Sequence, residues 1–142
     1  MNPTNAIDVL NRLLAVLYRS LPVYLQGARP WVGDEQRRGL DALARIAADQ
    51  RLYAQRVAEA VFQQGGRIET GQFPLDFTSV HDLSLEFLLR KAADYQRRDL
   101  EIIQECVAAL SDMPRLRTLA EEILGNAQGH LETLEETMKE ER

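Results

Sequence analysis

Hydrophobic residues recur at spacings of three and four along most of the chain, in four separate stretches. This spacing is typical of amphipathic helices that bury one side. It predicts helices over about 5–26, 34–64, 79–110 and 113–138. The clearest stripe lies in the last of them, where His130 shares the face formed by Leu116, Leu119, Ala120, Ile123, Ala127, Leu131, Leu134 and Met138. We therefore expect an all-α protein.

Polar and glycine residues at the ends of these stretches indicate where the helices begin and end. Asp34 is a candidate N-cap for the second helix, and Gly65 and Gly66 would end it. Ser79, with Asp82 three residues later, resembles a capping box and would start the third helix. Each predicted helix therefore has its own boundary signals.

Pro22 lies inside the first predicted helix. A proline at this position removes one backbone donor and clashes with the carbonyl group of Tyr18. We therefore expect a kink or a break near residues 18–22.

The segment 65–78 lacks helical periodicity. Its isolated apolar residues are expected to anchor it to the bundle (Ile68, Phe73, Leu75 and Phe77). An up-down-up-down bundle needs only short turns, so a connection of this length favours another topology. It predicts an antiparallel four-helix bundle with a long crossover between the second and third helices.

Composition narrows the class of protein. The chain has 142 residues, enough for one domain spanning 1–142. Its net charge of −5 arises from 17 basic residues interleaved with 22 acidic ones, which argues against binding nucleic acid. No apolar run is long enough for a membrane span, and we expect a cytoplasmic location. The single cysteine, Cys106, lies on an apolar helix face and is expected in the core.

Several stretches resemble ferritin-like di-iron proteins, and bacterioferritin most closely. In the last helix these are Glu122-Ile123-Leu124 and, after a gap, Gly129-His130-Leu131-Glu132. The start Ala6–Leu14, the pair Tyr24-Leu25 and the helix end Ala60–Gly66 also resemble that family. The resemblance covers nearly the whole chain and implies a ferritin-like bundle.

The resemblance also implies where metal ligands would lie. Such proteins hold two irons with a Glu from each of two helices and a Glu-x-x-His from each of the other two. In this chain those positions fall at Leu17, Gln50, Tyr53, Ala93, Ala127 and His130. An ungapped count back from His130 would choose Asp94 instead of Ala93, but Asp94 belongs to a charged outer row.

Only His130 keeps a ligand type, so we expect neither a di-iron cluster nor another cofactor. The Met that binds haem in bacterioferritin falls at Arg51, which removes the axial ligand. We expect Gln50, Tyr53 and His130 to meet at mid-bundle and to hydrogen-bond one another, directly or through a water. The alternative is that His130 bonds one local group while Tyr53 reaches the surface.

These observations leave three hypotheses for function. The first is a non-catalytic structural or interaction protein, a homodimer with an unidentified protein partner. The second is a metal-binding protein or oxidoreductase with a rearranged or intersubunit site. The third is a small-molecule binder that uses space between Ala93, Ala127 and the kink at Pro22. A dimer is expected in place of a cage, because bacterioferritin-like cages use a fifth helix and only Lys139–Arg142 follow Met138.

Overall fold

The computed structural model describes residues 2–27, 36–79 and 84–140. Within these ranges the chain forms helices and connecting segments and has no strand. In chain order the elements are α1 (Pro3–Tyr18), α2 (Leu21–Gly27), α3 (Arg37–Gln63), the 3₁₀ helix η2 (Leu75–Ser79), α4 (Leu85–Ala109) and α5 (Pro114–Glu140). None of the described helices is both long and apolar enough to cross a membrane. The predicted all-α class is confirmed.

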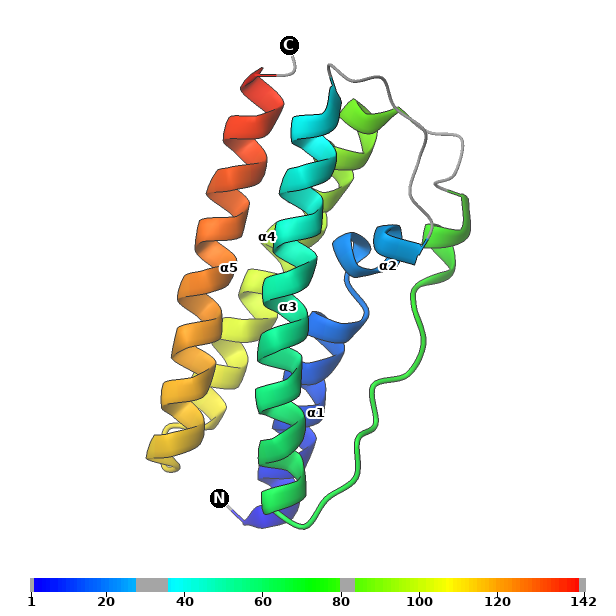
Figure 1. Cartoon of the computed structure of the whole chain (residues 1–142). Helices are drawn as coiled ribbons and strands as arrows, with labels where there is room; N and C mark the ends of the chain where they lie inside the picture. Colours follow the sequence, from blue (N-terminus) through cyan, green and yellow to red (C-terminus); the bar gives the residue numbers. More distant parts are fainter. Residues whose placement is uncertain (1, 28–35, 80–83, 141–142) are drawn as a thin grey trace.

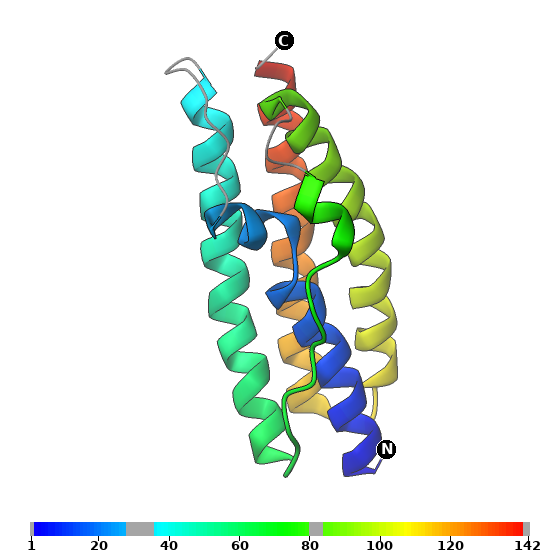
Figure 2. The same cartoon turned by 90° about the vertical axis from the view of Figure 1, so that its right-hand side faces the viewer.

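The long helices α1, α3, α4 and α5 form a four-helix bundle, and the short α2 lies across it, packed against α3 beyond the end of α1 (Figure 1). α1 packs against α3 and α4, and α5 packs against the same two helices. The segment between α3 and η2 runs along the outside of the bundle from its lower end up to the level of α2, and α3 and α4 run in the same direction (Figures 1 and 2). This is the long crossover that the sequence predicts.

The first predicted helix is broken where Pro22 indicates. α1 ends at Tyr18 and α2 begins at Leu21, so the prediction of one element over 5–26 is wrong and that of a break near 18–22 is confirmed. The Ser20 hydroxyl accepts a hydrogen bond from the Val23 backbone at 3.2 Å, and Pro22 lies in the first turn of α2. A proline is tolerated there because the first-turn backbone donors have no partner within the helix.

Two other predicted helix starts need correction. α3 begins at Arg37 rather than at 34, and its proposed cap, Asp34, lies outside the described residues. α4 begins at Leu85 rather than at 79, because Ser84 caps it by accepting a hydrogen bond from the Phe87 backbone at 3.2 Å. Ser79 instead ends η2, and Asp82 is not among the residues that the structure describes.

The crossover is anchored by its aromatic residues. Phe77 is 2% exposed, and the Phe73 and Tyr24 rings meet edge to face with centroids 5.2 Å apart. Ile68 and Leu75, also expected to be anchors, are 40% and 84% exposed. Phe77 therefore holds the crossover against the α2 end of the bundle.

The core consists of two apolar clusters placed end to end. One joins α1 to the second halves of α3 and α4 and the first half of α5; Leu17, Ala54, Ile103 and Ala127 belong to it. The other joins α2 and η2 to the opposite halves of the long helices; its members include Leu21, Ile46, Ala93 and Leu134. The core is enclosed by four walls, formed by α1 with α2, by α3, by α4 and by α5. In each wall, a buried polar residue lies between the two clusters.

Candidate functional site: a polar layer at mid-bundle

The polar layer consists of one buried side chain from each wall of the bundle. Ser20 lies between α1 and α2, Gln50 on α3, Gln96 on α4 and His130 on α5. Their exposed fractions lie between 3% and 7%. Buried polar groups are costly unless they are hydrogen-bonded, so their partners determine what this layer can do.

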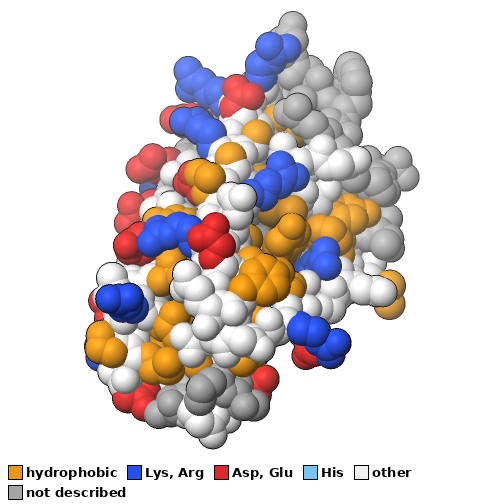
Figure 3. Space-filling model, turned by 60° about the horizontal axis from the view of Figure 1, so that its bottom comes forward, with side chains coloured by type: hydrophobic (Ala, Val, Ile, Leu, Met, Phe, Trp, Pro, Cys, Tyr) orange, Lys and Arg blue, Asp and Glu red, His pale blue; other side chains and the backbone are white. Residues whose placement is uncertain are grey.

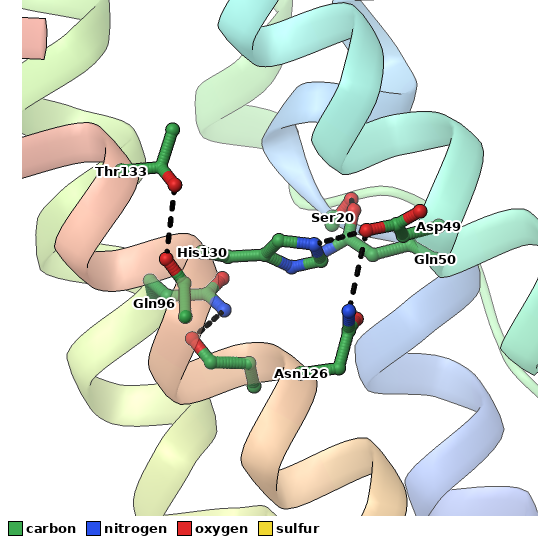
Figure 4. Close-up of polar contacts among 9 residues, drawn as sticks. Ser20, Asp49, Gln50, Gln96, Asn126, His130 and Thr133 are labelled. Carbon is green, nitrogen blue, oxygen red and sulfur yellow. Dashed lines mark hydrogen bonds and ion pairs between the residues drawn. The ribbon is translucent and has the colours of Figure 1, made fainter.

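The two amides bind partners within the protein. The Ser20 hydroxyl donates to Gln50 Oε1 at 2.6 Å. Gln96 Nε2 donates to the backbone carbonyl oxygen of Ala127 at 3.0 Å, across the α4–α5 interface (Figure 4). The Gln50 bond therefore links the α1–α2 break to α3, and the Gln96 bond links α4 to α5. The groups that make these two bonds are uncharged.

His130 points from α5 towards α3 and meets Asp49 at the edge of the bundle (Figure 4). His130 Nε2 lies 2.8 Å from Asp49 Oδ2, and Asn126 Nδ2 donates to the same oxygen at 3.2 Å. Partial burial alone would raise the pKa of the Asp49 carboxyl, but the hydrogen bonds from His130 and Asn126 and the charge of His130 lower it below its usual value. An ionised carboxylate only accepts, so Nε2 is the donor of this bond.

The other ring nitrogen of His130 faces the interior. Nδ1 is buried and has no hydrogen-bond partner among the described residues. In the neutral imidazole a proton on Nε2 leaves Nδ1 as an acceptor. A carboxylate that fixes the tautomer in this way is also the usual arrangement around metal-binding histidines. The chemistry of the layer therefore depends on what other donor atoms lie near this nitrogen.

The six positions that the resemblance predicts differ in burial. Leu17, Gln50, Ala93, Ala127 and His130 are all buried. Tyr53 is only partly buried, and the Arg56 guanidinium lies over its ring, 5.4 Å from the centroid. The preference for Ala93 over Asp94 as the inward residue is confirmed, because Ala93 is fully buried while Asp94 is exposed and pairs with Arg97.

Gln50, Tyr53 and His130 make no direct hydrogen bond to one another. Gln50 bonds Ser20, and His130 bonds Asp49. The triad was expected because Gln50 and Tyr53 lie on the inward stripe of one helix and His130 on that of another, but His130 Nε2 bonds Asp49 instead. The alternative, in which His130 bonds one group, is the arrangement observed, although that group belongs to another helix.

A pair of irons does not fit this layer. Leu17, Ala93 and Ala127 carry no donor atoms, and Gln50 offers only a neutral amide. In the described part of the chain, no three His, Cys, Asp or Glu side chains form a group that could hold a metal. Paired cations need several carboxylates to bridge them and balance their charge, and here a single, partly exposed carboxylate is bound to His130.

Sequence reasoning missed Ser20, Asp49 and Asn126. Asp49 lies about 100° from Gln50 around the helix axis, away from the inward stripe, so periodicity does not mark it as part of an inward site. A usable signal is the spacing of Asn126 and His130, four residues apart on one side of α5, which indicates a shared partner on the neighbouring helix.

A cavity lies beside the break between α1 and α2, under the crossover. Its volume is about 250 Å³, and its lining includes Arg19, Ser20, Phe77, Tyr95 and Asp99. Burial raises the pKa of the Asp99 carboxyl to about 7, although the charge of Arg98 opposes the shift. The sequence analysis expected space between Ala93, Ala127 and the kink at Pro22; this cavity lies beside the kink, but its lining includes neither Ala93 nor Ala127.

Comparison with known proteins bears on the fold. No family model matches the chain, and no curated protein matches it. Among solved structures it is similar to one described as ferritin-like, di-iron-carboxylate proteins from Bacillus anthracis str. Ames, with a TM-score of 0.80 and 17% identity over 96% of each chain. A similarity at this level of identity establishes the fold. The chain therefore has the ferritin-like fold, with the polar layer described above in the middle of its bundle.

Proposed function

We propose that this protein is a ferritin-like bundle without a di-iron centre, which acts as a structural or interaction protein and pairs with a second copy of itself. The observation that carries the proposal is the polar layer. Its buried members are a hydroxyl, two amides and an imidazole, and each has a protein partner; His130 keeps one nitrogen, Nδ1, without a partner among the described residues. We expect this role to be performed in the cytoplasm.

The packing around the layer supports this proposal. One apolar cluster borders the layer on each side, so the helices are joined above and below it by hydrophobic contacts. Carboxylates left in such a place without a metal would be expensive to bury, and the residues present avoid that cost. The bundle therefore needs no cations to hold its helices together.

Metal analysis tests the proposal against the alternative of a rearranged or intersubunit metal site. Protein purified without chelator is analysed for iron, manganese and zinc, together with the variant His130→Ala and the control His130→Gln, which keeps a polar side chain. The proposal predicts substoichiometric metal in all three proteins. Stoichiometric metal in the natural protein that is lost from both variants would overturn it.

A further inference from the structure

The cavity beside the α1–α2 break is lined by two groups of opposite charge that lack charged partners. Arg19 comes from the link between α1 and α2, and Asp99 comes from α4. Neither makes an ion pair with any residue that the structure describes, and they do not pair with each other. Unpaired charges beside a cavity cost stability, which makes both groups candidates for binding a ligand that supplies the missing partners.

The crossover holds the Arg19 guanidinium in place. Nη2 donates to Thr70 Oγ1 at 3.3 Å, and Cζ lies 5.2 Å from the centroid of the Phe73 ring. Nε is buried and has no hydrogen-bond partner among the described residues. Because arginine presents Nε and a terminal nitrogen as a fork to the two oxygen atoms of a carboxylate, Arg19 keeps an unused donor for such a group.

Asp99 lines the cavity without a hydrogen bond from any residue that the structure describes. The neighbouring Arg98 lies over the Tyr95 ring, 4.5 Å from its centroid, and the Tyr95 hydroxyl donates to Asp76 at 3.2 Å. Burial raises the pKa of the Asp99 carboxyl to about 7, so above this pH the cavity contains a carboxylate without a counter-charge. A ligand ammonium group would supply that charge and donate hydrogen bonds to it.

Apolar side chains form much of the remaining lining, and the space suits a small molecule. They come from α1, α2 and the segment that includes η2: Ala15, Val16, Leu21, Pro74 and Phe77. Figure 2 shows the crossover passing beside the α1–α2 break before it reaches η2. The volume of about 250 Å³ corresponds to about eight waters at ~30 Å³ each, so the ligand has a short hydrocarbon part.

Two larger surface pockets lack this combination of unpaired charges. Along α3, a groove of about 420 Å³ has Arg56 as the one cation among its described lining residues, and Arg56 already pairs with Glu122 at 2.7 Å. A pocket of about 460 Å³ lies between the end of α3 and the start of α5, and Arg115 is the one charged residue among the described residues that line it. At this lower end of the bundle, hydrophobic side chains lie among charged ones of both signs (Figure 3).

We propose that the cavity beside the α1–α2 break binds an α-amino acid with a small apolar side chain, whose carboxylate bonds Arg19 and whose ammonium group bonds Asp99. The side chain of this ligand packs against Val16, Leu21 and Phe77. A zwitterion supplies both missing partners at once and adds no net charge to the cavity. The inference goes beyond the proposed function, because it assigns a small-molecule ligand to a site beside the polar layer.

Calorimetric titration of the natural protein with L-alanine, L-valine and L-leucine at about pH 8, where Asp99 is ionised, tests the proposal. The amino acid that binds most tightly is then compared with analogues that lack one charged group. For L-valine these are isovalerate, which lacks the amine, and isobutylamine, which lacks the carboxylate. Removing either group leaves one charge in the cavity unpaired, and should raise the dissociation constant at least about tenfold.

Two variants test the assigned residues. Arg19→Gln and Asp99→Asn should each raise the dissociation constant of the amino acid at least about tenfold. The matched controls are Arg12→Gln on α1 and Asp94→Asn on α4, which change exposed, ion-paired residues outside the cavity. In these controls the dissociation constant should stay within about threefold of the natural value. Circular dichroism of each variant verifies that the bundle is folded.

The proposal is overturned if none of the three amino acids shows saturable binding. It is equally overturned if an analogue binds as tightly as its amino acid, or if both folded variants keep the natural affinity. The comparison of analogues uses the natural protein, so it tests the site even where a variant does not fold. None of these results depends on metal content, so the failure of this site and the failure of the metal-free assignment are distinguishable.

Discussion

Asp99 provides a quantitative test of how the cavity beside the α1–α2 break affects stability. Its carboxyl lines a cavity rather than open solvent, and no ion pair or hydrogen bond to it is found among the described residues. The pKa is raised from 3.8 to about 7. We predict that Asp99→Asn stabilises the protein above neutral pH.

The magnitude follows from proton linkage. A carboxyl with a raised folded-state pKa holds its proton more tightly when folded, so this group costs nothing below the unfolded pKa. The cost then grows as the pH rises, and it is complete above the folded pKa. A shift of about three pKa units corresponds to about 4 kcal/mol. Because the side chain keeps some contact with solvent, we expect Asp99→Asn to raise the free energy of unfolding by ~1–3 kcal/mol near pH 8.

Urea denaturation at about pH 4 and about pH 8 measures this effect. The advantage of Asp99→Asn over the natural protein should be small at the lower pH and larger at the higher one. The control is Asp94→Asn on the same helix, since Asp94 is exposed and pairs with Arg97 at 3.0 Å. An advantage that does not change with pH, or an Asn variant less stable at both values, would refute the reasoning and show that water or a counter-charge solvates Asp99.

Three further predictions concern the polar layer. Ser20→Ala removes the Gln50 partner and the cap of α2, and should lower the free energy of unfolding by ~1–3 kcal/mol, whereas the exposed Ser111→Ala should leave it nearly unchanged. The lowered pKa of Asp49 gives stability that is present above the unfolded pKa and is lost as the pH falls through the folded pKa. Asp49→Asn should therefore cost ~0.5–1 kcal/mol at neutral pH and less in acid, as measured by urea denaturation at both. Finally, a fivefold variant should bind two Mn²⁺ or Fe²⁺ ions with the native His130, as measured by anaerobic calorimetry; its substitutions are Leu17→Glu, Gln50→Glu, Tyr53→His, Ala93→Glu and Ala127→Glu. If this variant folds and binds neither ion, the positions carried over from the di-iron proteins are wrong.

The architecture was predictable because it depends on local signals. Apolar spacing predicted the helices, and a proline inside a helical stripe, Pro22, predicted the break. The connection 65–78 was too long for a turn, which indicated the crossover. The start of α4 was misplaced because Ser79 and Ser84 are both of a residue type that caps helices, and in the structure it is Ser84 that accepts the capping bond, from the Phe87 backbone.

The partners within the site were not predictable to the same degree. Periodicity identified Gln50 and His130 as inward-facing, and both are buried. It could not assign their hydrogen bonds, because these depend on how far each helix is rotated and how closely its neighbour approaches. Asp49 shows the limit: it lies at the edge of its helix, 46% exposed in its side chain, yet it accepts the His130 bond that was assigned to Tyr53 and Gln50.

Anomalous diffraction from crystals grown with excess Mn²⁺ tests the central claim most directly, because it locates any bound cation. The account predicts no anomalous peak within bonding distance of Gln50, Gln96 or His130. Two peaks at mid-bundle, bridged by Asp or Glu oxygen atoms, would contradict it.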